Sequence, residues 1–205
     1  MTDIHLTVLM TLRWVHITTA MLWIGVSYFM NFVLTPAARQ MDADIRRRAI
    51  PGILERALFW LKWGALATYV TGWLYLLYKC YGESNIGFHG PDGLGNTTWG
   101  HWISIGVILG TVLFVNVWWV IFPAQTRIIG WMRSGETPAE MPRLAGRVEK
   151  ASKINTYLSV PLIFSMASAS HLPIINGWIV TGMFIIGFAL VAHLYMIASR
   201  IFGRS

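Results

Sequence analysis

The sequence predicts an all-α integral membrane protein, a bundle of five transmembrane helices that forms one domain over residues 1–205. Of the 205 residues, 55% are hydrophobic and only 12% are charged, which is too apolar for a soluble domain of this size. A spanning helix needs about 20 mostly apolar residues. Five stretches meet or approach that length, at about residues 8–34, 57–79, 100–122, 155–171 and 177–199.

The distribution of positive charge predicts the orientation. Lysine and arginine are frequent in the connections over residues 37–56 and 123–154, whereas residues 80–99 contain neither. Basic connections mark the cytoplasmic side, so the N-terminus is expected outside and the C-terminus inside, in a multi-pass protein of the bacterial inner membrane. The net charge of +7 has this explanation, and no nucleic acid is expected as a partner.

Both basic connections contain residues that interrupt helices. Pro51 and Gly52 predict a break in the first one, with residues 45–49 lying on the membrane surface as a short amphipathic helix. In the second one, Gly135 and Pro138 predict a turn, followed by a helix over residues 142–152.

The first and third predicted spans share the spaced pattern His-x8-Gly-x5-Asn. It occurs as His16, Gly25 and Asn31, and again as His101, Gly110 and Asn116. Each copy is followed by a Pro-Ala pair, at residues 36–37 and 123–124. We interpret this as a duplicated two-helix unit whose pseudo-axis lies along the membrane normal. That arrangement places His16 and His101 at a similar depth.

A histidine within a membrane helix is costly unless it has a partner or a function. Neutral imidazoles on separate helices are the usual axial ligands of a haem b held inside a bundle. His16 and His101 are therefore predicted to bind a haem iron, with His171 as an alternative ligand or a hydrogen-bond partner of a ligand. The alternative is that each histidine only bonds to a neighbouring helix.

Other interpretations of these residues remain open. His16, His101 and His171 all fall toward the outer ends of their spans, so three imidazoles around copper or zinc form a less favoured alternative. His193 has no evident partner at its depth. The asparagines of the repeat, Asn31 and Asn116, are expected to hydrogen-bond across helices or to line a quinone or proton path.

Several short motifs occur in order along the chain. They are RWVH at 13–16, MLWIG at 21–25, NFV at 31–33, KWGA at 62–65, NVW at 116–118, PAQ at 123–125 and NTYLSVP at 155–161. Together they resemble the membrane domain at the N-terminus of bacterial membrane-bound urate oxidases, the type that is fused to a cytochrome c. A weaker similarity, confined to the first span, is to the small haem-binding membrane oxidases of the protoporphyrinogen pathway.

The main resemblance implies a multi-helix membrane domain that passes substrate electrons to a c-type cytochrome. This sequence carries no cytochrome c domain after its fifth span, so the chain is expected to hand electrons to a separate protein. The weaker resemblance implies that His16 binds haem.

Three hypotheses follow. The first is a haem b-binding electron-transfer subunit that works between a quinol or small reductant and a periplasmic c-type cytochrome. The second is the membrane subunit of a urate oxidase that needs a separate cytochrome c. The third is a non-redox accessory subunit of a larger respiratory or photosynthetic complex.

Overall fold

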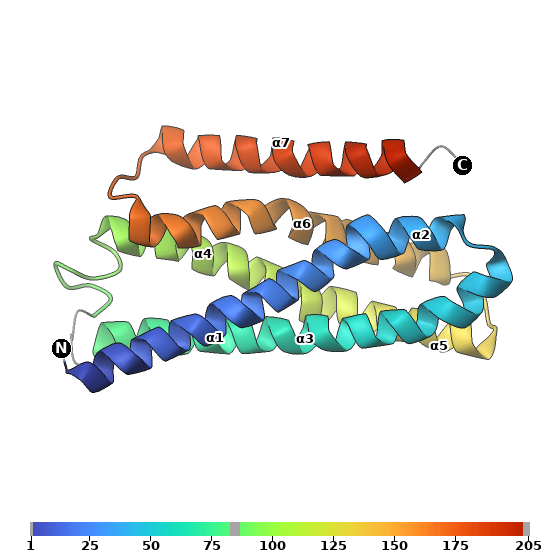
Figure 1. Cartoon of the computed structure of the whole chain (residues 1–205), viewed down its shortest axis with the longest axis horizontal. Coiled ribbons are helices and arrows are strands. Elements are labelled where there is room, and N and C mark those ends of the chain that lie inside the picture. Colours follow the sequence, from blue (N-terminus) through green and yellow to red (C-terminus); the bar gives the residue numbers. More distant parts are fainter. Residues whose placement is uncertain (1, 83–86, 203–205) are drawn as a thin grey trace.

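The computed structural model describes residues 2–82 and 87–202. Long helical rods run side by side along one axis, as Figure 1 shows. The described residues contain helices and connections but no strand. The predicted all-α class is therefore confirmed.

Three of the rods are long and apolar enough to cross a membrane: Asp3–Gln40, Thr98–Ser134 and Gly177–Ile201. Large apolar side chains are exposed on these rods, with both Met21 and Ile186 at 70%. Such surfaces are unfavourable in water and match the hydrocarbon of a bilayer. The chain is a membrane protein, while the other two predicted spans, over residues 57–79 and 155–171, remain predictions.

The first rod joins three helical segments without a break: α1 (Asp3–Tyr28), the π-helical η1 (Phe29–Leu34) and α2 (Thr35–Gln40). Thr2 caps its start, since the Thr2 hydroxyl accepts the backbone N–H of His5 at 3.3 Å. The chain turns at residues 41–42 and returns as the second rod.

The second rod is the single helix α3 (Ala43–Tyr81), whose 39 residues extend for about 58 Å at 1.5 Å per residue. The predicted break at Pro51 and the separate surface helix over residues 45–49 are therefore wrong. Proline removes one backbone hydrogen bond and crowds the preceding turn. Ile50, Pro51 and Leu54 are all buried, however, and the packing of this turn offsets the cost of the proline.

The third and fourth rods are α4 (Thr98–Val115), η2 (Asn116–Ile121) and α5 (Phe122–Ser134), followed by α6 (Met141–His171). Gly135 ends α5 with φ of 76°, in the left-handed region that favours glycine. The predicted turn at this glycine is confirmed. The helix predicted over residues 142–152 is also confirmed, as the first part of α6.

The first and third rods share a π-helical segment placed in the same way. They contain 38 and 37 residues. In each, the π segment ends two residues before the proline, at Leu34 before Pro36 and at Ile121 before Pro123. Proline lacks the N–H that would close a regular helical bond, and π segments recur at functional sites. The parallel supports the predicted duplication.

The last helix, α7 (Gly177–Phe202), lies at the edge of the bundle, apart from most other helices (Figure 1). It packs mainly on α6. Its contact face carries the buried residues Met183, Gly187 and Val191, four residues apart. The opposite side is apolar and exposed, so we expect it to face lipid.

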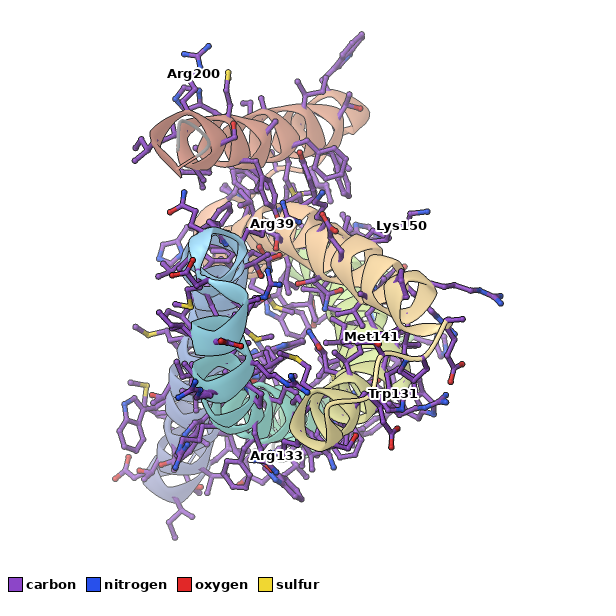
Figure 2. The ribbon with its side chains drawn as sticks, turned by 90° about the vertical axis from the view of Figure 1, so that its right-hand side faces the viewer. Arg39, Trp131, Arg133, Met141, Lys150 and Arg200 are labelled. Carbon is purple, nitrogen blue, oxygen red and sulfur yellow. The ribbon has the colours of Figure 1, made fainter. Side chains whose placement is uncertain are left out.

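The helices before α7 pair closely as α1 with α3 and as α4 with α6. α1 also contacts α6, and α3 contacts α4 and α5. These contacts arrange the four helices in a ring, with α1 and α4 at opposite corners, and the end-on view in Figure 2 agrees. Apolar residues from all four helices fill the interior, among them Trp23, Leu58, Leu113 and Leu162.

Basic side chains gather at one end of the bundle, which we call the basic end. It contains the turn between α2 and α3 and the turn between α5 and α6, on the right of Figure 1. Arg39, Arg133 and Lys150 all lie there in Figure 2. The opposite end, which carries the start of α1, is called the N-terminal end. The charge asymmetry is as predicted, and the side of the membrane on which the basic end lies remains a prediction.

A three-residue ion cluster ties α2 to α6 at the basic end. The Glu149 carboxylate lies 2.8 Å from Lys153 Nζ and 3.3 Å from Arg39 Nη2. The Lys153 hydrogen bond, reinforced by the charges of Lys153 and Arg39, holds the pKa of Glu149 below its ordinary value, although partial burial opposes this shift. A carboxylate with a lowered folded-state pKa stabilises the fold above its ordinary pKa, and this contribution disappears as the pH falls through the lowered value.

We therefore expect the difference in Tm between the protein and its Glu149→Gln variant to shrink as the pH is taken from 6.5 to below about 4.3. The effect should be small, because all three side chains are solvent-exposed. Thermal unfolding in detergent at a series of pH values measures it. Glu136→Gln, an exposed change in the preceding turn, serves as the control. A Tm difference between the protein and Glu149→Gln that stays constant with pH contradicts the stabilising role assigned to the Glu149 carboxylate.

Candidate functional site

His16 is held against α3 by one hydrogen bond and one close contact. Its Nδ1 lies 2.8 Å from the Thr68 carbonyl oxygen. Because a carbonyl only accepts, Nδ1 carries the proton and Nε2 keeps its lone pair. The ring also fits over Gly72, where an added Cβ would lie 2.8 Å from His16 Cε1. The tautomer with the proton on Nδ1 and the lone pair on Nε2 is the one that an imidazole needs in order to bind a metal through Nε2.

The position of His16 on α1 places it on the helix face that packs against α3. Trp23 and Met30 follow it at intervals of seven residues, about two helical turns, and both are buried. His16 itself is partly buried. It thus combines a ring nitrogen that keeps its lone pair with partial burial against α3, two properties that suit a haem ligand in a bundle.

His101 is placed differently, although the sequence repeat treats the two histidines as equivalent. Its side chain is exposed, and its Nε2 donates to the Gly95 carbonyl oxygen at 3.0 Å. The buried position belongs to the next residue, Trp102, which is completely inaccessible to solvent. One residue is a rotation of about 100° on a helix, so His101 lies beside the interior face of α4.

The remaining predicted ligand, His171, is also exposed, and so is His193, which was not among the predicted ligands. His171, at the end of α6, donates from Nδ1 to the Ala167 carbonyl oxygen at 3.0 Å. His193 lies on the exposed side of α7. In the described ranges, no three histidine, cysteine, aspartate or glutamate residues come together as a metal site. The imidazoles of His16, His101 and His171 bond to three separate segments, so their union on one cofactor remains a prediction.

Sequence reasoning gave His5 no role, yet it is the most deeply buried histidine that the structure describes. Its exposed fraction is 0%, and neither ring nitrogen has a hydrogen-bond partner. The ring stacks on Tyr78 of α3, with 4.9 Å between centroids. The signal was present in the sequence: His5 precedes His16 by 11 residues, about three turns, and so shares its helix face.

The asparagines of the repeat both bond to α6, as the sequence predicted for contacts across helices. Asn31 Nδ2 donates to Ser152 Oγ at 2.8 Å, and Asn116 Nδ2 donates to Asn155 Oδ1 at 3.0 Å. Asn155 in turn donates to the Leu113 carbonyl oxygen at 3.1 Å. Both asparagines of the repeat lie in the π segments. The equivalent residues of the two copies therefore converge on neighbouring turns of one helix.

Further hydroxyl groups extend this polar network to Tyr28 on α1 and to Tyr195 on α7. The Tyr28 hydroxyl lies 2.7 Å from Ser159 Oγ, and the Tyr195 hydroxyl donates to Asn31 Oδ1 at 3.2 Å. A cavity of about 10 Å³ borders the network beside Asn155 and Ser159, which is room for about one water molecule. Interhelical polar bonds of this kind stabilise membrane bundles and also line proton paths.

The fold and these polar positions define the class of protein: an all-α membrane protein with a half-buried histidine on its first helix and a polar network around α6. The family model for the urate oxidase N-terminal domain matches residues 96–202, more than half of the 205-residue chain. The chain belongs to this family.

The matched region runs from the start of α4 to the end of α7. It includes the later motifs of the resemblance, such as NTYLSVP at 155–161, whereas the motifs around His16 lie outside it. No curated protein and no solved structure matches the chain.

Proposed function

We propose that the chain is an electron-transfer subunit that binds haem b toward the N-terminal end of the bundle. It would pass electrons between a quinol or small reductant and a periplasmic c-type cytochrome. The observation that carries the proposal is the state of His16, whose Nδ1–H donates to the Thr68 carbonyl oxygen and whose Nε2 keeps a lone pair that can bind a metal. Membership of the urate oxidase N-terminal family is the second observation that supports the proposal.

Bound haem supplies one-electron transfer through its iron, and the chain supplies its position and setting. Thr68 fixes the tautomer and direction of the His16 ring, and Gly72 leaves space for that ring between α1 and α3. The Thr68 hydroxyl also donates to Thr19 at 3.0 Å, which fastens the two helices at the same level. Apolar side chains in the bundle interior would exclude water from a haem bound there.

His101 is the proposed second ligand on the strength of the repeat and of the opposite-corner arrangement of α1 and α4. Its bond to Gly95 uses Nε2–H and leaves Nδ1 as the nitrogen with a lone pair. The exposed ring must turn toward α1 before both imidazoles can bind one iron. His171 is the alternative second ligand, with Nε2 free because Nδ1 is bonded to Ala167.

The same proposal includes five transmembrane crossings, with the N-terminal end outside and the basic end in the cytoplasm. The support is the concentration of arginine and lysine at one end of the bundle. Electrons would then leave near His16 on the periplasmic side, where c-type cytochromes are soluble partners.

A pyridine haemochrome assay on protein purified from haem-replete cells tests the proposal. We expect a pyridine haemochrome of the b type, and we expect the untreated, reduced protein to show the low-spin spectrum of a bis-imidazole haem. His16→Ala should lose essentially all bound haem. His193→Ala, on the exposed side of α7, is the matched control and should keep its haem. His101→Ala and His171→Ala identify the second ligand. A colourless wild-type protein, or equal haem in the His16 and His193 variants, overturns the proposal.

A second candidate function is the membrane subunit of a urate oxidase that works with a separate cytochrome c. The family match favours it, since the family is defined by the N-terminal domain of such oxidases. A family relation alone is weak support for a substrate. Deletion of the gene should abolish urate-dependent reduction of cytochrome c in membranes, and an unchanged rate removes this candidate.

A further inference from the structure

An open groove lies between α1 and α3 on the outer surface of the bundle. Its volume is about 450 Å³, and its walls are apolar, with Met21 on α1, Phe29 at the start of η1, and Ile53 and Trp60 on α3. Gly25 forms part of its floor, where an added Cβ would meet no atom within 4 Å. In a membrane protein such a groove is open to the lipid, and its shape suits a flexible hydrocarbon chain.

One charged side chain, Arg56, stands among the residues that line the groove. Its Nη1 donates to the Gly52 carbonyl oxygen at 3.0 Å, so the guanidinium lies back along α3 toward the basic end. Arginine has five N–H donors in a planar fork, and this bond uses only one of them. A phosphate group is the ligand that such a fork binds in bidentate geometry.

The depth of the groove fits a phospholipid. Arg56 immediately precedes the predicted span over residues 57–79, at the level where headgroups lie. From Ile53 to Trp60 the groove follows α3 for about 10 Å, which reaches from the headgroup region into the acyl chains. Arg46, Arg47 and Arg48 are exposed on α3 further toward the basic end. Their positive potential favours an anionic lipid over a neutral one.

We propose that this groove is a binding site for an anionic phospholipid, with an acyl chain between α1 and α3 and its phosphate on Arg56. A quinone offers only apolar contacts to the groove and carries no charge to complement the arginine, so it should bind much more weakly. The site lies outside the polar network and contains no histidine, so it is separate from the proposed electron-transfer function.

The test uses the full chain purified in detergent and depleted of lipid. Dioleoyl-phosphatidylglycerol should raise Tm more than dioleoyl-phosphatidylcholine, while inorganic phosphate and a short-chain ubiquinone should have little effect. From the dependence of Tm on lipid concentration, Arg56→Gln should weaken the apparent affinity for phosphatidylglycerol about fivefold, the usual effect of one arginine at an anionic surface. Arg143→Gln, an exposed change on α6, is the matched control.

Gly25→Leu tests whether the acyl chain occupies the groove. The new side chain extends into open space, so it should leave the lipid-free Tm nearly unchanged and reduce the response to both phospholipids. The proposal is overturned if Arg56→Gln and Arg143→Gln respond alike, or if Gly25→Leu keeps the full lipid response. It is also overturned if phosphate alone or the ubiquinone reproduces the stabilisation. Should Gly25→Leu fail to fold, the Arg56 comparison still decides.

Discussion

Replacing Trp102 with alanine is expected to lower the free energy of unfolding by about 3 kcal/mol. Trp102 has no solvent-accessible surface, and its ring packs edge-on against Phe164 with centroids 5.8 Å apart. Its Nε1 also donates to the Ile174 carbonyl oxygen at 3.2 Å, which ties α4 to the connection before α7. We expect a loss at the low end of the range for truncation of a buried tryptophan. In lipid, the transfer of apolar surface adds little to helix association, so the substitution removes mainly packing contacts.

The matched control is Trp178→Ala, since Trp178 is 89% exposed and lies at the same end of the molecule. It should change stability by no more than about 0.5 kcal/mol. Unfolding by a denaturing detergent in mixed micelles measures both variants. If the two substitutions lower the free energy of unfolding by the same amount, the buried position assigned to Trp102 is wrong.

The placement of Trp102 also shows why the sequence repeat identified the helices but not the orientation of their histidines. A pattern of His, Gly and Asn fixes positions along a helix, whereas burial depends on rotation about its axis. On α1 the seven-residue series through Trp23 and Met30 includes His16. On α4 the corresponding series runs through Trp102 and Leu109, and it does not include His101, which is the residue before Trp102. Comparing these apolar series, not the repeat alone, would have separated the two histidines.

The helical rods were predictable because long apolar runs leave few alternatives in a membrane. The uninterrupted course of α3 through Pro51 was not, since local propensity argues for a break and only tertiary burial of the adjoining turn overrides it. The π segments were likewise invisible in composition. Their common position before Pro36 and Pro123 becomes clear only once the backbone is seen.

The polar network was partly predictable. Asn31 and Asn116 stood out in the sequence because amides are costly in a membrane helix unless bonded. Their partners, Ser152 and Asn155, could not be identified, because serine and asparagine on α6 have no distinguishing spacing. His5 escaped notice for a related reason: it lies at the very start of α1, where sequence alone suggests exposure to water.

Replacing Gly72 with alanine is expected to displace the His16 ring and to cost about 1–3 kcal/mol, the usual range for overpacking an interior. The new Cβ would lie 2.8 Å from His16 Cε1 and 3.0 Å from Nδ1, closer than van der Waals contact permits. Either the ring rotates away from the Thr68 carbonyl or α1 and α3 separate. Both responses remove the bond that fixes the His16 tautomer.

Nitrogen-15 NMR of labelled histidine reports this change directly, through the ring-nitrogen shifts of His16 before and after substitution. Gly182→Ala on α7 is the control, since an added Cβ there meets nothing within 4 Å, and the change should leave the His16 signals in place. Any haem bound through His16 should be lost or weakened in Gly72→Ala alone. If the His16 signals are unaltered in Gly72→Ala, the ring does not lie over this glycine, and the geometry on which the proposed ligand rests is wrong.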